Sequence, residues 1–149
     1  MGVRVGVDLV EVDRVQTLLK QQPAASSELF TERELAACSG RRDRYVRLAG
    51  RFAAKEAVLK ALGTGLGPRM RWTDVEIVNE PWGKPRVHLY GEVAAVWRRR
   101  GAGQVEISIS HTAGLALAHA VLVETAACAC VSGHSAVTPE PSSEVHGDG

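Results

Sequence analysis

Valine or leucine occupies every second position from 3 to 9, and small or polar residues fill the positions between them. This period of two predicts a half-buried strand, in which Asp8 lies near the strand's end and points away from the valine face. Hydrophobic residues then recur with helical spacing in three segments, which are separated by residues typical of helix ends. We therefore expect helices at 11–20, at 31–40 behind a Thr31 and Glu34 capping box, and at 42–62.

The second half of the chain returns mainly to the alternation of strands. We expect strands at 74–78 and around Val87 and Leu89, joined by a turn at 79–85 that is rich in Asn, Pro and Gly. A short helix at 91–100 and two strands, at 105–110 and 115–123, complete the pattern. The predicted fold class is α+β, with a mostly antiparallel sheet packed against helices on one face.

Length and composition limit the chain to one folded domain. A chain of 149 residues has room for a single core, and we expect that domain at 1–125. Residues 126–149 form an acidic tail that is rich in Ser, Pro and Gly and lacks Lys and Arg, so we expect it to be disordered. Cys38, Cys128 and Cys130 lack the spacing of a zinc site and are expected to be free thiols.

Charge and hydropathy indicate which partners to expect. No stretch approaches the roughly 18 apolar residues of a membrane span, and the amino terminus lacks a signal-peptide pattern. We therefore expect a cytoplasmic protein without a membrane partner. The domain carries 18 Lys and Arg against 14 Asp and Glu, about +4, which suits acidic protein or small-molecule partners. No nucleic acid is expected among them.

Glu56 stands out because it is a carboxylate in the apolar stripe of the long helix. At about 100° per residue, Tyr45, Phe52 and Leu59 fall on one arc, and Glu56 falls on the same side. An unpaired buried charge is costly, so Glu56 needs a cation, a metal ion or water. The simplest alternative is an ion pair with Lys60, one turn along the helix, which is worth about 0.2–0.5 kcal/mol.

Asp8 and Glu56 together form a candidate magnesium site. They lie far apart in sequence, on a strand and a helix that the fold can bring together. Magnesium prefers oxygen ligands and is typically held by one or two carboxylates, while substrate phosphates and water complete its shell. A turn or helix-cap carboxylate is the alternative role for Asp8 alone.

Basic residues and glycines near the long helix are candidates for phosphate binding. One flank of the helix carries Arg44, Arg47, Arg51 and Lys55. The helix is followed by Gly63-Thr64-Gly65, whose backbone amides are typical of a phosphate cradle. The alternatives are a solvated cationic face and a simple helix stop.

Four motifs occur in order along the domain. Residues 6–15 form the first, and residues 51–65 fit the pattern F-A-x-K-E-A-x-x-K-A-x-G-T-G. The third is the turn Asn79-x-x-x-Gly83-Lys84-Pro85, and the fourth is the segment at 107–112 that ends in His111-Thr112. Together these motifs resemble the holo-acyl-carrier-protein synthases, the small class of 4′-phosphopantetheinyl transferases, nearly end to end over the domain.

The resemblance implies an enzyme that transfers the phosphopantetheine arm from coenzyme A to a serine of apo acyl carrier protein and releases adenosine 3′,5′-bisphosphate. The catalytic residues that it implies are Asp8, Glu56 and Lys60, with Asp8 and Glu56 as magnesium ligands. The implied coenzyme-binding residues are Arg51, Lys60, Gly63, Thr64, Gly65, Lys84, Pro85 and His111. Arg14 would face the acidic helix of the carrier protein, and the family is usually a homotrimer with active sites between subunits.

Several alternatives stay open. The carrier protein could belong to fatty acid biosynthesis, and so to lipid metabolism, or to a polyketide or other secondary pathway. A protein that binds coenzyme A or carrier domains without catalysis is a further alternative. The serine proton could pass to Glu56 or to a water molecule. The family often has a glycine where this chain has Arg4, which we expect to line the cleft or a subunit interface.

Overall fold

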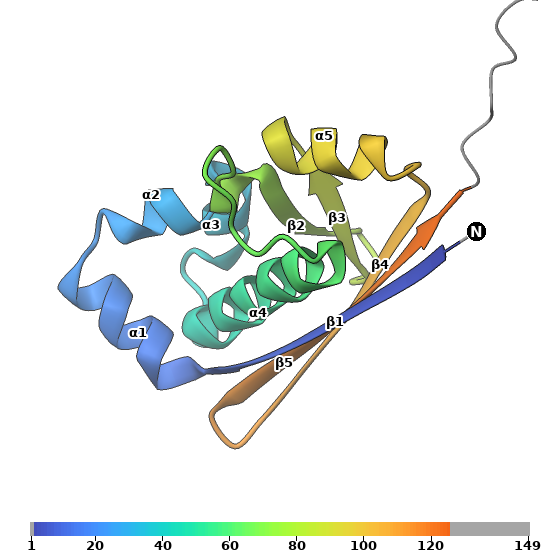
Figure 1. The fold of residues 1–149 in the computed structure, drawn as a ribbon. Helices are drawn as coiled ribbons and strands as arrows, with labels where there is room; N and C mark the ends of the chain where they lie inside the picture. Colours follow the sequence, from blue (N-terminus) through green and yellow to red (C-terminus); the bar gives the residue numbers. More distant parts are fainter. Residues whose placement is uncertain (1, 126–149) are drawn as a thin grey trace, which may run out of the picture.

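The long helix α4, Arg44–Leu62, runs through the centre of the structure, and the other elements pack around it (Figure 1). The computed structural model describes residues 2–125. Three strands lie along one side of α4 and form an antiparallel sheet in the order β1–β5–β4. These strands are β1 (Gly2–Glu11), β5 (Leu115–Glu124) and β4 (Gln104–Thr112).

A second, smaller sheet consists of the hairpin β2–β3. Its strands are Val75–Asn79 and Pro85–Leu89, close to their predicted positions. The α+β class is confirmed, but the one mostly antiparallel sheet expected from the sequence is divided into two. Alternation along a strand shows how its two faces differ, whereas strand order depends on pairing between distant segments.

Four further helices surround the core. They are α1 (Val12–Gln21), α2 (Ala25–Leu29), α3 (Glu32–Cys38) and α5 (Gly91–Arg99), and a single 3-10 turn, η1 (Trp72–Asp74), precedes β2. The short helix α2 was not predicted, because Pro23 and the serines after it favour a loop. The predicted capping box is confirmed, since the Thr31 amide donates to Glu34 Oε1 at 2.9 Å and the Glu34 amide donates to Thr31 Oγ1 at 3.3 Å.

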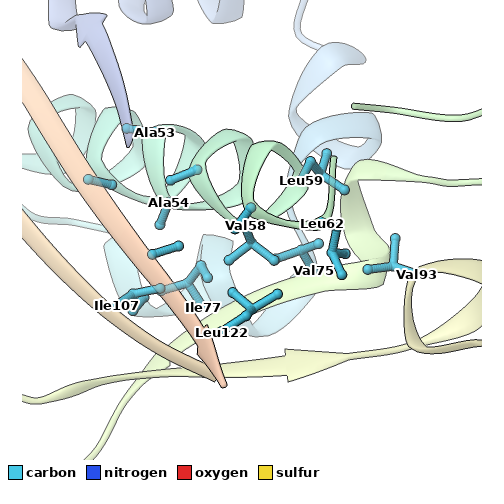
Figure 2. Packing of buried hydrophobic residues seen from close by; sticks show 14 of the residues in the cluster. Ala53, Ala54, Val58, Leu59, Leu62, Val75, Ile77, Val93, Ile107 and Leu122 are labelled. Carbon is cyan, nitrogen blue, oxygen red and sulfur yellow. The ribbon is translucent and has the colours of Figure 1, made fainter. Parts of the chain in front are cut away.

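Small side chains allow the three-stranded sheet to pack closely on α4. The buried contact is formed mainly by alanines, which are Ala53, Ala57 and Ala61 on α4 and Ala116, Ala118 and Ala120 on β5. Larger residues, among them Val58, Leu62 and Leu122, fill the space between α4 and the two sheets (Figure 2). Because the interface is alanine-rich, backbone and side chains of β1 come within contact distance of α4.

Burial of the two faces of β1 is the reverse of what the alternation suggests, because the apolar face is exposed and the other face is covered. Val3, Val5, Val7 and Leu9 are 64, 62, 53 and 58% exposed, whereas Gly6 is buried against α4. Asp8 does point away from the valine face, as predicted, but this places it on the α4 side. It also lies three residues before the end of the strand rather than at its end. The face with Gly6 lies against the helix, because a side chain at position 6 would overlap the α4 backbone.

Some predictions concern residues that are not described. The acidic tail, with Cys128 and Cys130, lies outside residues 2–125. Within the described part, Cys38 is a buried free thiol at the end of α3. None of the described helices combines the length and the hydrophobicity needed to cross a bilayer.

Candidate active site

A glycine brings β1 into direct contact with α4 at the point where the predicted catalytic residues meet. A Cβ atom on Gly6 would lie 2.0 Å from the carbonyl oxygen of Ala57 and 2.8 Å from the amide nitrogen of Ala61. Both are backbone atoms that a side chain cannot displace, so only glycine fits. Two residues further along β1, Asp8 consequently lies beside the Glu56 and Lys60 side of α4.

Lys60 forms an ion pair with Asp8 across this contact. Its Nζ donates to Asp8 Oδ1 at 2.8 Å and to the carbonyl oxygen of Val7 at 3.1 Å. The Lys60 side chain is 52% exposed and that of Asp8 is 16% exposed, so the pair opens to solvent. The Asp8 carboxylate raises the pKa of Lys60 through this hydrogen bond and its charge. The alternative of a Glu56–Lys60 ion pair is wrong, because Lys60 pairs with Asp8 instead.

Glu56 is half-buried next to this pair. Burial raises the pKa of its carboxyl group, and the negative charge of Asp8 raises it further, although Lys60 acts in the opposite direction. Two carboxylates and one ammonium group thus share a small region at the crossing of β1 and α4. Such an arrangement favours a cation and can position charge around a phosphate ester.

A groove of ≈ 490 Å³ extends from Asp8 along α1. Its lining includes Arg14, the predicted partner-binding residue, together with Glu11, Leu18 and Phe52. The groove is lined by apolar side chains with charged residues among them. Asp8 and Arg14, which were predicted to act on different partners, therefore share one surface.

A second pocket, of ≈ 430 Å³, is lined by several basic side chains. Four of the predicted coenzyme-binding residues line it, namely Arg51 from α4, Lys84 from the β2–β3 turn, Pro85 at the start of β3, and His111 from β4. Arg51 is only 5% exposed, and its Nε atom has no hydrogen-bond partner. A buried guanidinium with a free donor is suited to an anionic group.

Two further residues of this pocket are not among the coenzyme-binding residues that the resemblance implied. Asn79 accepts a hydrogen bond from Arg51 Nη2 at 3.4 Å, and its own amide donates to the carbonyl oxygen of Gly83 at 3.1 Å. Arg47 lies in the lining, where its Nε donates to Asp43 at 2.8 Å. Asn79 opens the predicted turn motif, and Arg47 belongs to the basic flank of α4, so both signals were present in the sequence.

The segment Gly63-Thr64-Gly65 lines neither the groove nor the pocket. Gly63 adopts a left-handed conformation, with φ of 74°, and ends α4. Its amide donates to the carbonyl oxygen of Lys60 at 2.9 Å, and the Thr64 amide donates to that of Leu59 at 3.3 Å. Two of the three amides are thus already used in the helix cap, which leaves the Gly65 amide for a ligand.

Lys55 departs from the predicted cationic flank. It is fully buried, and its Nζ donates to Glu34 Oε1 at 2.7 Å and to the carbonyl oxygen of Trp72 at 3.0 Å. Burial lowers the pKa of Lys55, and the negative charge of Glu34 opposes this change. The interpretation of this flank as a solvated face is therefore wrong for Lys55 and Arg51, because α3 and β2 cover it.

Arg4 is bound within the sheet. Its guanidinium forms an ion pair with Glu124 at the end of the neighbouring strand β5. It lies on the same face of β1 as Gly6, as expected. Within the described chain, its partner is therefore a carboxylate of the sheet itself.

Comparison with known proteins identifies the family. The model of the 4′-phosphopantetheinyl transferase superfamily matches residues 4–120. A holo-[acyl-carrier-protein] synthase of Moorella thermoacetica is 42% identical over 117 residues, which are 78% of this chain and 91% of the relative. The corresponding protein of Streptomyces avermitilis is 44% identical over 116 residues, 78% of this chain and 93% of the relative.

Solved structures agree with this assignment. The holo-[acyl-carrier-protein] synthase of Neisseria meningitidis superposes with a TM-score of 0.74 at 29% identity, over 81% of this chain and 98% of that one. The Helicobacter pylori synthase in complex with coenzyme A gives a TM-score of 0.70 at 29% identity, over 80% and 99% of the two chains. The chain belongs to the 4′-phosphopantetheinyl transferase superfamily.

Proposed function

We propose that this protein transfers the 4′-phosphopantetheine group from coenzyme A to a serine of an apo acyl carrier protein. The relatives named as holo-[acyl-carrier-protein] synthases support this activity, and one of the similar structures holds coenzyme A. The observation that carries the proposal is the cluster of Asp8, Glu56 and Lys60 where β1 crosses α4. Phosphoryl transfer depends mainly on such positioned charges.

Asp8 and Glu56 are suited to hold Mg²⁺. Two neighbouring carboxylates, both partly buried, repel each other, and a divalent cation between them relieves that repulsion. The described residues contain no group of three or more His, Cys, Asp or Glu that could hold a metal ion, so water and the substrate pyrophosphate would complete the shell. When bound, the ion supplies charge neutralisation at the reacting pyrophosphate.

The residues of the cluster have separate roles in the reaction. The serine hydroxyl oxygen attacks the phosphorus that carries the pantetheine arm, and the bond from this phosphorus to the bridging oxygen breaks. Negative charge then develops on the departing adenosine 3′,5′-bisphosphate, and the solvent-open ammonium group of Lys60 is proposed to stabilise it. The serine proton passes either to Glu56 or to a water molecule.

The pocket around Arg51 is suited to the phosphates of coenzyme A. Arg51, Lys84 and His111 converge there, and the unpartnered Nε of Arg51 supports an anionic ligand. Pro85 forms part of its wall. Gly63, Thr64 and Gly65, at the end of α4 beyond Lys60, are proposed to contact the pyrophosphate side, mainly through Gly65.

A homotrimer with sites between subunits accounts for two features of the chain. The catalytic cluster and the Arg51 pocket have no lining residue in common, so one copy can supply the cluster and a neighbour the pocket. The exposed valine face of β1 continues onto β5 through Leu117, which pairs with Leu9. An apolar sheet face of this kind marks a protein interface.

Mixing two inactive variants tests this arrangement. Glu56→Gln disables the catalytic cluster, and Arg51→Ala disables the pocket. If each site takes residues from two copies, a reassembled mixture regains part of the activity that each variant lacks. A mixture that stays inactive, although both variants form trimers, contradicts a shared site.

Arg14 and the positive charge of the domain are proposed to contact the acidic carrier protein. Arg14 is exposed on α1 and lines the groove that leads to Asp8. A serine presented along this groove would reach the catalytic cluster. Raising the salt concentration should weaken carrier binding, and a salt-independent affinity would contradict an electrostatic contact.

One experiment tests the activity itself. The full chain is incubated with apo carrier protein, coenzyme A and magnesium, and the carrier is weighed by mass spectrometry. The expected result is a gain of one phosphopantetheine. An unchanged mass would support a non-catalytic binder instead.

A second experiment identifies the pathway. Fatty-acid and polyketide carrier proteins compete for modification by the same enzyme, and the carrier that is modified faster indicates the pathway. The cytoplasmic location stays a prediction.

A further inference from the structure

The only fully buried ion pair among the described residues lies outside the catalytic cluster. Lys55 and Glu34 are both 0% exposed, and Lys55 Nζ lies 2.7 Å from Glu34 Oε1. The remaining donors of the Lys55 ammonium go to the carbonyl oxygens of Trp72 and Val75. All three donors of Lys55 are therefore used, and none points to a ligand.

Glu34 uses both of its oxygen atoms in this network. Oε1 accepts from Lys55 and from the Thr31 amide at 2.9 Å, and Oε2 accepts from the Ile77 amide at 3.1 Å. Glu34 thus binds the amino terminus of its own helix α3, the centre of α4 and the middle of β2. A single ion pair thus connects three elements, α3, α4 and β2.

The pair fixes the position of β2 along α4. Lys55 binds the start of β2 through Val75, and one turn earlier on α4, Arg51 binds its end through Asn79. Hydrophobic contacts of Val75 and Ile77 hold the strand against the core, but they have little directionality. Hydrogen bonds to backbone atoms of β2 specify its register, which is the best-attested use of buried polar groups.

The hairpin that β2 starts forms one wall of the Arg51 pocket. Asn79, Gly83, Lys84 and Pro85 lie in this wall. The hairpin has no strand pairing to the three-stranded sheet, and its ion pair with that sheet, Lys84–Glu106, is about half exposed. Exposed pairs contribute little to position. Besides the packing of β3 against β4, the location of this wall opposite Arg51 therefore depends on how β2 is held on α3 and α4.

We propose that Lys55 and Glu34 are positioning residues for the coenzyme pocket. By setting the register of β2 on α4, their buried ion pair holds the hairpin wall at the correct distance from Arg51. Neither residue contacts the ligand. This inference rests on the proposed function of the Arg51 pocket as the coenzyme site.

The test measures binding of adenosine 3′,5′-bisphosphate to the full-length protein by calorimetry. Lys55→Met removes the charge with little change in volume, and Glu34→Gln removes the opposite charge and serves if Lys55→Met does not fold. We expect each to weaken binding about tenfold or more, because small displacements of positioning groups are costly. We also expect the KM for coenzyme A to rise more than the KM for carrier protein, and faster hydrogen exchange at 75–89.

Two controls separate the possible failures. Leu19→Ala removes a buried side chain of α1 whose core cluster contains no hairpin residue, so it lowers stability without moving the pocket wall. Arg51→Ala removes the proposed phosphate ligand itself. If Arg51→Ala binds the bisphosphate like the wild type, the pocket is not the coenzyme site. If Arg51→Ala fails to bind but Lys55→Met and Glu34→Gln bind as tightly as Leu19→Ala, the positioning role is refuted.

Discussion

Two lysines of α4, five residues apart, form ion pairs with carboxylates of distant segments, yet their surroundings are opposite. Lys55 is fully buried with Glu34 and donates to two backbone carbonyls. Lys60 is half-exposed with Asp8, beside a second carboxylate, Glu56. The buried pair is closed to solvent and its ammonium has no spare donor for a ligand, whereas the exposed pair is open to solvent and to a ligand. Similar pairing chemistry thus joins elements of the core in one place and, in the proposed function, takes part in the reaction in the other.

The largest expected effect is a loss of activity on substitution of Glu56, which lies beside the exposed Asp8–Lys60 pair. Glu56→Gln removes a charge from the catalytic cluster with little change in volume. We expect turnover to fall by about a thousandfold, because a positioned charge at the reacting centre is lost. The thermal midpoint should stay close to that of the wild type. Carrier mass spectrometry and a melting curve check both points, and unchanged activity would refute the role of Glu56 as a metal ligand.

Lys60→Met, like Glu56→Gln, should reduce activity strongly and stability only slightly. We expect kcat to fall about a hundredfold, because the ammonium beside the leaving phosphate is lost. Stability should change little, because the Lys60 side chain is open to solvent. Denaturant unfolding and initial rates measure the two quantities. A large loss of stability with normal kcat would reverse the assignment of the two lysines.

Lys55→Met should reduce stability strongly and kcat only modestly, the opposite of Lys60→Met. Removing one partner of a buried ion pair leaves Glu34 uncompensated, and we expect the free energy of unfolding to fall by about 3–5 kcal/mol. The kcat of the folded fraction, at saturating coenzyme A, should change less than in Lys60→Met. Unfolding in urea measures the first quantity. A variant as stable as the wild type would show that the pair contributes no net stability.

Gly6→Ala tests how closely β1 must approach α4 for the exposed pair to form. The new methyl group would overlap backbone atoms of Ala57 and Ala61, so we expect a loss of about 3 kcal/mol and a weaker Asp8–Lys60 contact. Gly50→Ala is the matched control, because its Cβ would meet only one side-chain methyl, Ile109 Cγ2, at 2.9 Å and no backbone atom. Equal effects of the two substitutions would contradict a backbone clash at Gly6.

The smallest expected effect concerns Cys38, a buried thiol on the same helix as Glu34. Its ionisation and alkylation report on packing around the Lys55–Glu34 pair. Burial raises the pKa of this thiol, so it stays neutral in the folded protein at pH values where an unfolded cysteine begins to ionise. Stability should therefore fall slightly as the pH rises above about 8.5, because the unfolded state then releases a proton that the folded state keeps. Alkylation at Cys38, followed by peptide mass spectrometry, should be slow in the wild type and faster in Lys55→Met than in Lys60→Met.

Much of the fold was predictable from local sequence features. The Thr31 and Glu34 capping box and the left-handed Gly63 bound their helices as expected, because caps act within one or two turns. Asp8 and Glu56 were also recognisable as a pair of interest. The short helix α2 and the division into two sheets were not, since neither follows from periodicity alone.

The sequence by itself determined the order of strands and helices apart from α2, the two-sided character of β1, and the identity of the two carboxylates, Asp8 and Glu56, proposed as the metal site. Only the tertiary structure decided that Lys60 pairs with Asp8, that Lys55 is buried, and that the valine face of β1 is exposed. Periodicity shows how the two sides of one element differ, but burial and ion pairing depend on which other element packs against it. Here side-chain size decides the packing, because glycine on β1 and alanine on α4 and β5 allow a close approach that larger side chains would prevent.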